Sequence, residues 1–248
     1  MRLIFPFLFL LIFNFSKSQN FEIIGTKHNG NKNLNETVLY QKLDEEKPDI
    51  ILVEGWQKYK KVRGLKIGKA LGIWKPTIEQ IAIQSYKSKH KNVLIIPIDS
   101  IFDHNSYSKI LDKNLDSING LLKKTNFKTR DSVRFEEYRR RNSIVSLALE
   151  NYTLNELNEN HFVNQFSEYY NADREFLEQV LHQYYPTSTV TKWFSEHIIF
   201  TNERDKFMSN KISKILSKYK NEKIILLVGL AHKKVIQDYL ATENPIYK

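Results

Sequence analysis

Four short apolar runs, each closed by a glycine or an acidic residue, most limit the folds open to this chain of 248 residues. The runs lie at residues 21–26, 48–55, 92–99 and 222–229. Continuous apolar runs of this length are typical of parallel strands that are buried on both faces of a sheet. We therefore predict four buried parallel strands, three near the start of the chain and one near its end.

Helical patterns fill the intervals between these strands. Residues 34–47 carry leucine and valine at helical spacing, and residues 76–91 begin at Pro76, which we predict to start a helix. From about residue 105 to 220 the chain holds only long amphipathic segments and no strand pattern. The sequence predicts an α/β fold with a mostly parallel central sheet and a large helical insertion before the last strand.

The start of the chain predicts export. Residues 3–15 are almost entirely apolar and follow Arg2, a pattern typical of a signal peptide. We predict cleavage of residues 1–18, between Ser18 and Gln19, which leaves one secreted or periplasmic domain over residues 19–248. An uncleaved membrane anchor and a buried core helix are the alternatives.

Composition narrows the chemistry and the partners. The chain has no cysteine, which excludes disulfides, thiolate metal sites and a cysteine nucleophile. Its net charge is +10, but the lysines are dispersed rather than aligned with aromatic residues, so we predict no nucleic-acid partner. The basic run from Arg139 to Arg141 leaves open a peripheral contact with an anionic envelope surface.

Ionisable side chains follow all four predicted strands. His28 and His232 each end a Gly-x-x-His motif, in which a glycine turn would bring the backbone close to a ligand; Glu54 follows the second strand and Asp99 the third. The carboxyl ends of parallel strands meet at one edge of a sheet, where ligands bind. Two imidazoles and a carboxylate suit divalent Mn, Co, Zn or Fe, which would activate water and polarise a carbonyl group. We predict that His28, Glu54 and His232 are metal ligands and catalytic residues.

Other interpretations of these residues stay open. In a site without metal, His28 would be the general base, oriented by Glu54, and water or a substrate hydroxyl would be the nucleophile. Alternatively, His28 and His232 are structural histidines in the core or at helix caps. Glu54 would then only cap the segment that follows it.

Arg204 and Asp205 begin a predicted helix at residues 202–216. There Asp205 would stabilise the helix dipole, whereas Arg204 could reach the site and bind an anion or an oxyanion, so we include it among the catalytic residues. Asp99, with Asp103 and His104 after it, would supply a further ligand or cap the next helix. The roles of Asp99 and Asp205 are left open.

Four of these segments together resemble one family. They are GTKH at residues 25–28, VEG at 53–55, ERDKFM at 203–208 and ILLVGLAH at 225–232. In their order and spacing, the segments are similar to the TraB/GumN/Tiki group, part of a superfamily that also holds the erythromycin esterases and the haem-binding ChaN proteins. The chain departs from the GumN pattern after His232, where Lys233-Lys234-Val235 stands in place of a Leu-x-Gly run.

The resemblance implies an α/β fold with a helical insertion. For the Tiki branch it implies a divalent-metal protease, with His28, Glu54 and His232 at the metal and Arg204 and Asp205 in the Arg-Asp/Asn helix motif. We thus predict an exported metal-dependent hydrolase that acts on a peptide or on a small-molecule amide or ester. The alternative is a periplasmic haem-binding or iron-binding protein of the ChaN type without catalysis, in which tyrosines of the insertion ligate haem. The candidate tyrosines are Tyr169, Tyr170, Tyr184 and Tyr185.

Overall fold

The computed structural model describes residues 20–54, 76–99 and 104–243, and its strands form one parallel sheet. The order of the strands across the sheet is β1-β4-β2-β3. Their bounds are β1 (Phe21–Thr26), β2 (Ile50–Val53), β3 (Leu94–Pro97) and β4 (Ile224–Gly229). Each strand lies inside a predicted apolar run, so the prediction of a parallel sheet is confirmed.

Helices occupy the predicted intervals. The first two are α1 (Glu36–Glu46) and α3 (Ile78–Lys89), and α3 is capped by Thr77 in a capping box with Gln80. Pro76 therefore precedes the cap rather than starting the helix as predicted. The insertion and the last helix comprise α4 (His104–Lys124), α5 (Thr129–Asn151), α6 (Leu154–Asn158), α7 (Asn160–Tyr184), α8 (Thr189–Lys218) and α9 (Leu230–Glu243). The α/β fold with a helical insertion is thus confirmed.

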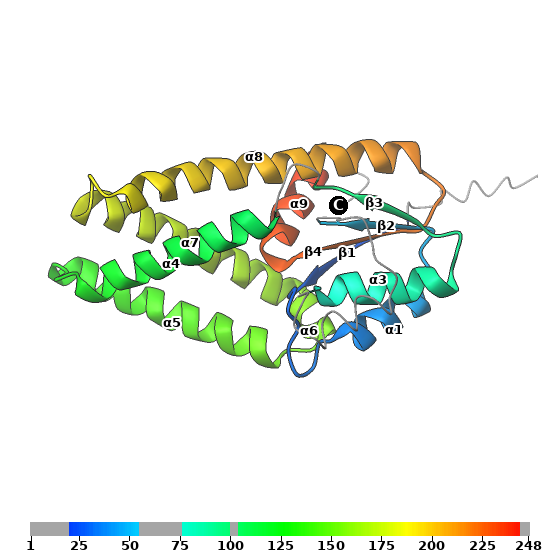
Figure 1. Cartoon of the computed structure of the whole chain (residues 1–248), viewed down its shortest axis with the longest axis horizontal. Coiled ribbons are helices and arrows are strands. Elements are labelled where there is room, and N and C mark those ends of the chain that lie inside the picture. Colours follow the sequence, from blue (N-terminus) through cyan, green and yellow to red (C-terminus); the bar gives the residue numbers. More distant parts are fainter. Residues whose placement is uncertain (1–19, 55–75, 100–103, 244–248) are drawn as a thin grey trace, which may run out of the picture.

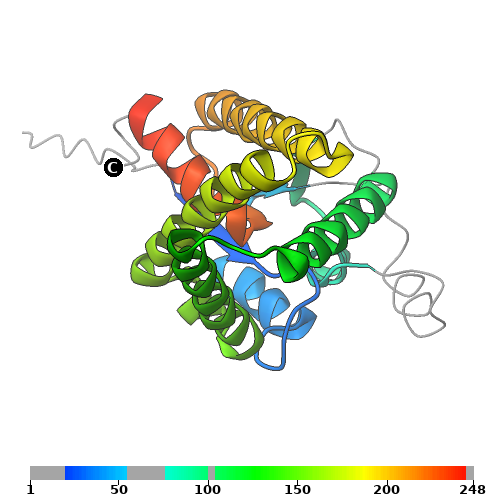
Figure 2. The same ribbon diagram turned by 90° about the vertical axis from the view of Figure 1, so that its left-hand side faces the viewer.

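Helices cover both faces of the sheet (Figure 1). Side chains alternate along each strand, so Ile51 and Leu227 pack with α1 and α3, whereas Leu52 and Leu226 pack with α8 and α9. The carboxyl ends of the strands point toward the insertion helices, which extend from the sheet and surround its end in the view of Figure 2. The edge of the sheet where the strands end, which the predicted site residues follow, therefore faces the insertion helices.

The third strand is less buried than predicted. β3 is an edge strand with β2 as its strand neighbour, and its Leu94 is 42% exposed. Only the following Ile98 is fully buried. An apolar run indicates that a strand can be buried, but it does not show whether the strand has neighbours on both sides or on one side.

The predicted helix at residues 202–216 is part of a much longer one. Because α8 begins at Thr189, Arg204 and Asp205 lie in its middle, and the expectation that they open a helix is wrong. Asp205 has no helix terminus to stabilise, so dipole stabilisation cannot explain it. Both residues point instead to the end of the sheet, as the contacts below show.

Some predictions fall on residues that the structure does not describe. The signal peptide at residues 1–18, its cleavage site, Gly55 and Asp103 lie outside the described ranges, and so does the side chain of His104. Among the described helices, none combines the length and the apolar character of a membrane span.

Candidate functional site

The four residues predicted from sequence meet at the carboxyl end of the sheet. The Nε2 atom of His28 lies 3.8 Å from Oε2 of Glu54, and Nε2 of His232 lies 3.5 Å from Oε1 of the same carboxylate. Arg204 reaches them from α8 and places Nη1 3.2 Å from Nε2 of His232. Residues that are far apart in sequence, which follow β1 and β2 or lie on α8 and α9, thus form one cluster.

Gly229, the glycine of the second Gly-x-x-His motif, allows this close approach. Gly25 and Gly229 are strand residues without positive φ, so the predicted glycine turn is wrong. A Cβ atom on Gly229 would lie 3.1 Å from Nε2 of His28 and 3.2 Å from Oε2 of Glu54. The backbone N–H of Gly229 also donates to Oε2 of Glu54 at 2.8 Å. A side chain at position 229 would therefore push the imidazole of His28 and the carboxylate of Glu54 away from the backbone of β4.

A carboxylate holds the inner nitrogen of each imidazole. Nδ1 of His28 lies 2.9 Å from Oε1 of Glu79, and Nδ1 of His232 lies 2.5 Å from Oδ1 of Asp205. Each Nδ1 can donate its proton to the carboxylate, which leaves Nε2 as the nitrogen that can accept a proton. The Nε2 atoms of both rings face Glu54 in the cluster. Asp205 therefore has a positioning role that the sequence left open.

Glu79 is a site residue that the sequence analysis missed. It is buried at the start of α3, and the hydroxyl of Thr26 donates to the carboxylate oxygen that also binds His28. In the sequence Glu79 stands in the first turn of a helix, where an acidic residue is ordinarily explained by the helix dipole. Glu79 meets His28 only because the start of α3 packs against the end of β1.

Arg204 joins two buried carboxylates. Its Nη2 lies 2.5 Å from Oε1 of Glu54, and its Nε donates to Oδ2 of Asp99 at 2.8 Å. The side chains are 11% exposed for Arg204, 7% for Glu54 and 0% for Asp99. The guanidinium is thus engaged by the protein's own carboxylates, which differs from the predicted clamp on a substrate anion. Asp99 acts as its ion-pair partner, and Glu54 does more than cap a segment.

Electrostatic interactions within the cluster shift its pKa values in opposite directions. Burial acts to raise the pKa of Glu54, but His232, His28 and Arg204 outweigh it and lower the pKa to about 2. Burial acts to lower the pKa of His28, but the hydrogen bond and the charge of Glu79, with the charge of Glu54, raise it to about 9. Glu54 is therefore ionised at neutral pH, and His28 retains its proton more strongly than a free imidazole does.

The arrangement fits a divalent ion only in part. Imidazoles whose Nδ1 is bound by a carboxylate are typical of metal sites. However, the guanidinium of Arg204 contacts both Oε1 of Glu54 and Nε2 of His232, which are two of the predicted ligand atoms. Within the described residues, no group of three or more histidines and carboxylates is arranged to hold a metal ion. As arranged, these side chains do not fit the ion, and metal binding by His28, Glu54 and His232 stays a prediction.

Comparison with known proteins leaves this site as the main source of inference. No family model, curated protein or solved structure matches the chain. The resemblance to the TraB/GumN/Tiki group accordingly stays a prediction that rests on the four short segments.

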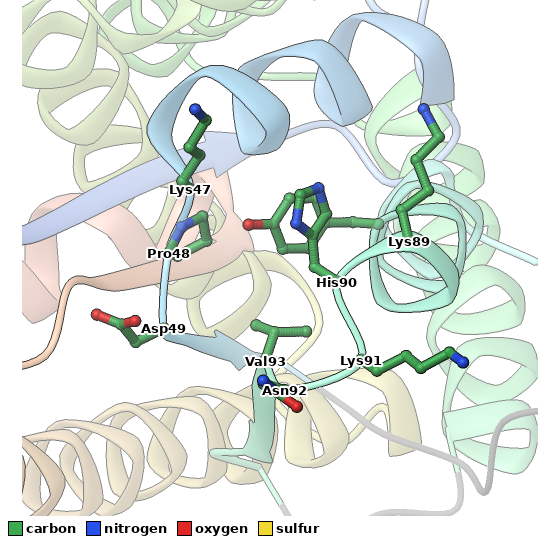
Figure 3. Close-up of a pocket in the computed structure, with 9 residues that line it drawn as sticks. Lys47, Pro48, Asp49, Lys89, His90, Lys91, Asn92 and Val93 are labelled. Carbon is green, nitrogen blue, oxygen red and sulfur yellow. The ribbon is translucent and has the colours of Figure 1, made fainter.

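A pocket of about 600 Å³ lies at the opposite end of the strands (Figure 3). It is formed by the segments that lead into β2 and β3, and Lys47 and Lys89 stand at its rim. The Nε2 atom of its histidine, His90, lies 2.9 Å from Oδ1 of Asp44. This end of a parallel sheet is not where ligands of such folds are usually bound, and we assign the pocket no role in the chemistry.

Replacing Gly229 with alanine should damage the site more than the fold. The added methyl would press on His28 and Glu54, and we expect a loss of stability of about 1–3 kcal/mol, typical of overpacking, together with a displaced imidazole. Thermal denaturation and turnover measure the two effects. Gly120→Ala is the control, since a Cβ there meets nothing within 4 Å and alanine in a helix should stabilise by about 0.5–1 kcal/mol. Full activity of the Gly229→Ala protein would contradict the arrangement.

Proposed function

We propose that this protein is a hydrolase in which His28 is the general base that activates water toward an ester or amide carbonyl. The observation that carries the proposal is the asymmetry of the His28 ring. Its Nδ1 is held by the buried carboxylate of Glu79, whereas its side chain is 46% exposed, so the ring combines a fixed orientation with solvent access. A buried carboxylate and a half-exposed imidazole form the orienting group and the base that such reactions need.

The reaction follows from these positions. Nε2 of His28 removes a proton from water, and the hydroxide oxygen bonds to the carbonyl carbon of the substrate. Glu79 stabilises the resulting imidazolium through Nδ1. When the intermediate collapses, the bond from carbon to the leaving oxygen or nitrogen breaks, and His28 returns the proton to the leaving group. Glu54, fixed by Arg204 and the N–H of Gly229, places a second negative charge beside the imidazolium.

A substrate panel tests the proposal and separates it from the metal-dependent form. Chromogenic esters and fluorogenic peptides are incubated with the wild-type protein after EDTA treatment, and again with added Mn²⁺ or Co²⁺. Turnover that survives EDTA supports His28 as a general base that needs no metal. Turnover that appears only with Mn²⁺ or Co²⁺ favours the metal-dependent hydrolase implied by the TraB/GumN/Tiki resemblance. Absence of turnover under every condition would reject hydrolysis of these substrate classes.

The pH profile should place His28 in the reaction. A general base acts when neutral, and His28 is neutral only above its pKa of about 9. We expect kcat/KM to rise with pH, about tenfold per unit, until this pKa is passed. Glu79→Gln removes a negative partner that raises the pKa of His28, so the rising part of the profile should move to lower pH. A profile that does not change between pH 6 and 10 would contradict the assignment.

Haem binding gains no support from the predicted tyrosines. The hydroxyl of Tyr184 donates to Asp131, and the hydroxyl of Tyr185 pairs with Thr125 at 2.7 Å. Tyr170 packs against Phe166 in a stacked pair. These contacts are those of helix packing within the insertion. A haem titration with no spectral change in the Soret region would agree with a packing role for these tyrosines, and a new band would favour the haem-binding alternative.

A further inference from the structure

A side chain of the insertion pairs with the outer edge of β1. Among the residues that the structure describes, β1 has β4 as its only neighbouring strand, which leaves the outward N–H and C=O groups of β1 without a strand partner. Asn158, the last residue of α6, meets these groups at Gly25. The N–H of Gly25 donates to Oδ1 of Asn158 at 2.7 Å, and Nδ2 of Asn158 donates to the carbonyl of Gly25 at 2.9 Å. One amide thus pairs with β1 as a neighbouring strand would.

A buried lysine fixes the orientation of this amide. Nζ of Lys233 lies 2.7 Å from Oδ1 of Asn158, and an ammonium group can only donate, so the atom facing it must be the oxygen. Nδ2 completes its bonds by donating to the carbonyl of Leu154 at 2.7 Å. Lys233 is only 4% exposed, and it forms no ion pair with a carboxylate in the described part of the chain. Its burial is therefore explained by Asn158 rather than by charge pairing.

The two motifs of the site meet at this amide. Gly25 stands three residues before His28, and Lys233 directly follows His232. A Cβ atom on Gly25 would lie 2.9 Å from Cδ1 of Leu230 and 3.1 Å from Cδ of Lys233, so β1 and α9 pack closely at this glycine, and a larger residue would displace these two side chains. Asn158 therefore bonds to the residue that begins one Gly-x-x-His motif and to the lysine that follows the other.

We propose that Asn158 is a positioning residue that joins the insertion to the end of β1 and so holds His28 against Glu79. The proposal rests on the assigned role of His28 in hydrolysis. The hydrogen bonds that join Asn158 to Gly25 and Lys233, which we call the Asn158 clamp, do not depend on that role. It gives the insertion a function, because the position of α6 then sets the position of the base. Asn158 does not touch the reacting atoms and acts through its hydrogen bonds with Gly25 and Lys233.

Substitutions at Asn158 test this role. Asn158→Leu keeps a similar size and removes all four hydrogen bonds, whereas Asn158→Asp keeps the acceptor and removes both donors. We expect kcat to fall about 10²-fold in the leucine variant with little change in KM, as a displaced base would cause. The NMR signal of the Nδ1 proton of His28, assigned from its absence in His28→Gln, should broaden or shift. Asn142→Leu, in the same insertion but bonded to Tyr138 and Asp173, is the control and should leave both readouts unchanged.

Hydrogen exchange in the wild-type protein is a second test that does not depend on a variant folding. The amide of Gly25 should exchange slowly because Asn158 accepts its hydrogen bond. The amide of Ile23 faces the same side of β1, two residues earlier, and should exchange faster. Equal exchange rates at the two amides would overturn the clamp.

The outcomes separate the clamp from the hydrolase. If the Asn158 variants disturb the His28 signal but the wild-type protein hydrolyses nothing, the clamp holds and the proposed function fails. If the wild-type protein is active and the folded Asn158 variants keep both the rate and the His28 signal, the function holds and the clamp is wrong.

Discussion

Arg204→Met should lower the free energy of unfolding by about 3–5 kcal/mol, because it leaves two buried carboxylates facing each other without their cation. Glu54 and Asp99 both contact Nη2 of the guanidinium, at 2.5 Å and 2.7 Å. Methionine fills a similar volume, so the loss would report charge rather than a cavity. Urea denaturation at pH 7 measures it.

Two further variants define the cause of this effect. Arg139→Met removes an arginine that is 63% exposed and that pairs, within the described residues, with the exposed Glu136, and we expect less than about 1 kcal/mol from it. Adding Asp99→Asn to Arg204→Met removes one of the two facing negative charges and should recover part of the stability. A cost at Arg204 no larger than at Arg139 would show that the buried charges do not depend on the guanidinium.

His28→Gln should lower kcat by about 10²–10⁴-fold while the protein stays folded. Glutamine can still hydrogen-bond to Glu79 but cannot take a proton from water. The measurement is turnover of the best substrate from the ester and amide panel, with circular dichroism as the check on folding. Because the pKa of His28 is raised to about 9, its protonated ring stabilises the fold beside Glu54 and Glu79 at neutral pH, so we also expect some loss of stability in this variant.

His90 provides a matched control for this variant. Its side chain is 37% exposed, and its Nε2 lies 2.9 Å from a carboxylate oxygen of Asp44, so it is also a partly exposed histidine beside a carboxylate, although Asp44 is 45% exposed and Glu79 only 4%. It lies at the opposite end of the strands, beside the pocket of Figure 3. His90→Gln should leave kcat unchanged. Equal losses at His28 and His90 would mean that the proposed base has no special role.

The fold was largely predictable from sequence because buried strands leave a local signal. The apolar runs at residues 21–26 and 222–229 need no knowledge of their neighbours to be identified as strands. The edge position of β3 was not predictable, since exposure of Leu94 depends on which strands lie beside it. The full length of α8 was also missed, although Val190, Trp193 and Phe194 continue an apolar face of the helix toward its start at Thr189.

The site was predictable in its strand-end residues and not in their partners. His28, Glu54 and His232 follow strands, and parallel strands bring their carboxyl ends together in any such sheet. Glu79 and Asn158 belong to helices, and their sequence positions are those of ordinary helix-terminal residues. Their roles depend on how α3 and α6 pack against β1, which no local pattern encodes.

The central place of β4 in the sheet has a consequence for biosynthesis. β4 is the last strand to leave the ribosome, yet it lies between β1 and β2, and the Thr26 hydroxyl bonds to a carbonyl 202 residues later, at Val228. Until Ile224 has emerged, the nascent chain carries apolar strands with unpaired edges, the form most prone to aggregate. Among the described strands, β2 and β3 can pair with each other before then, but β1 has no strand partner until β4 is made, so a chain that stops before Ile224 would keep β1 unpaired.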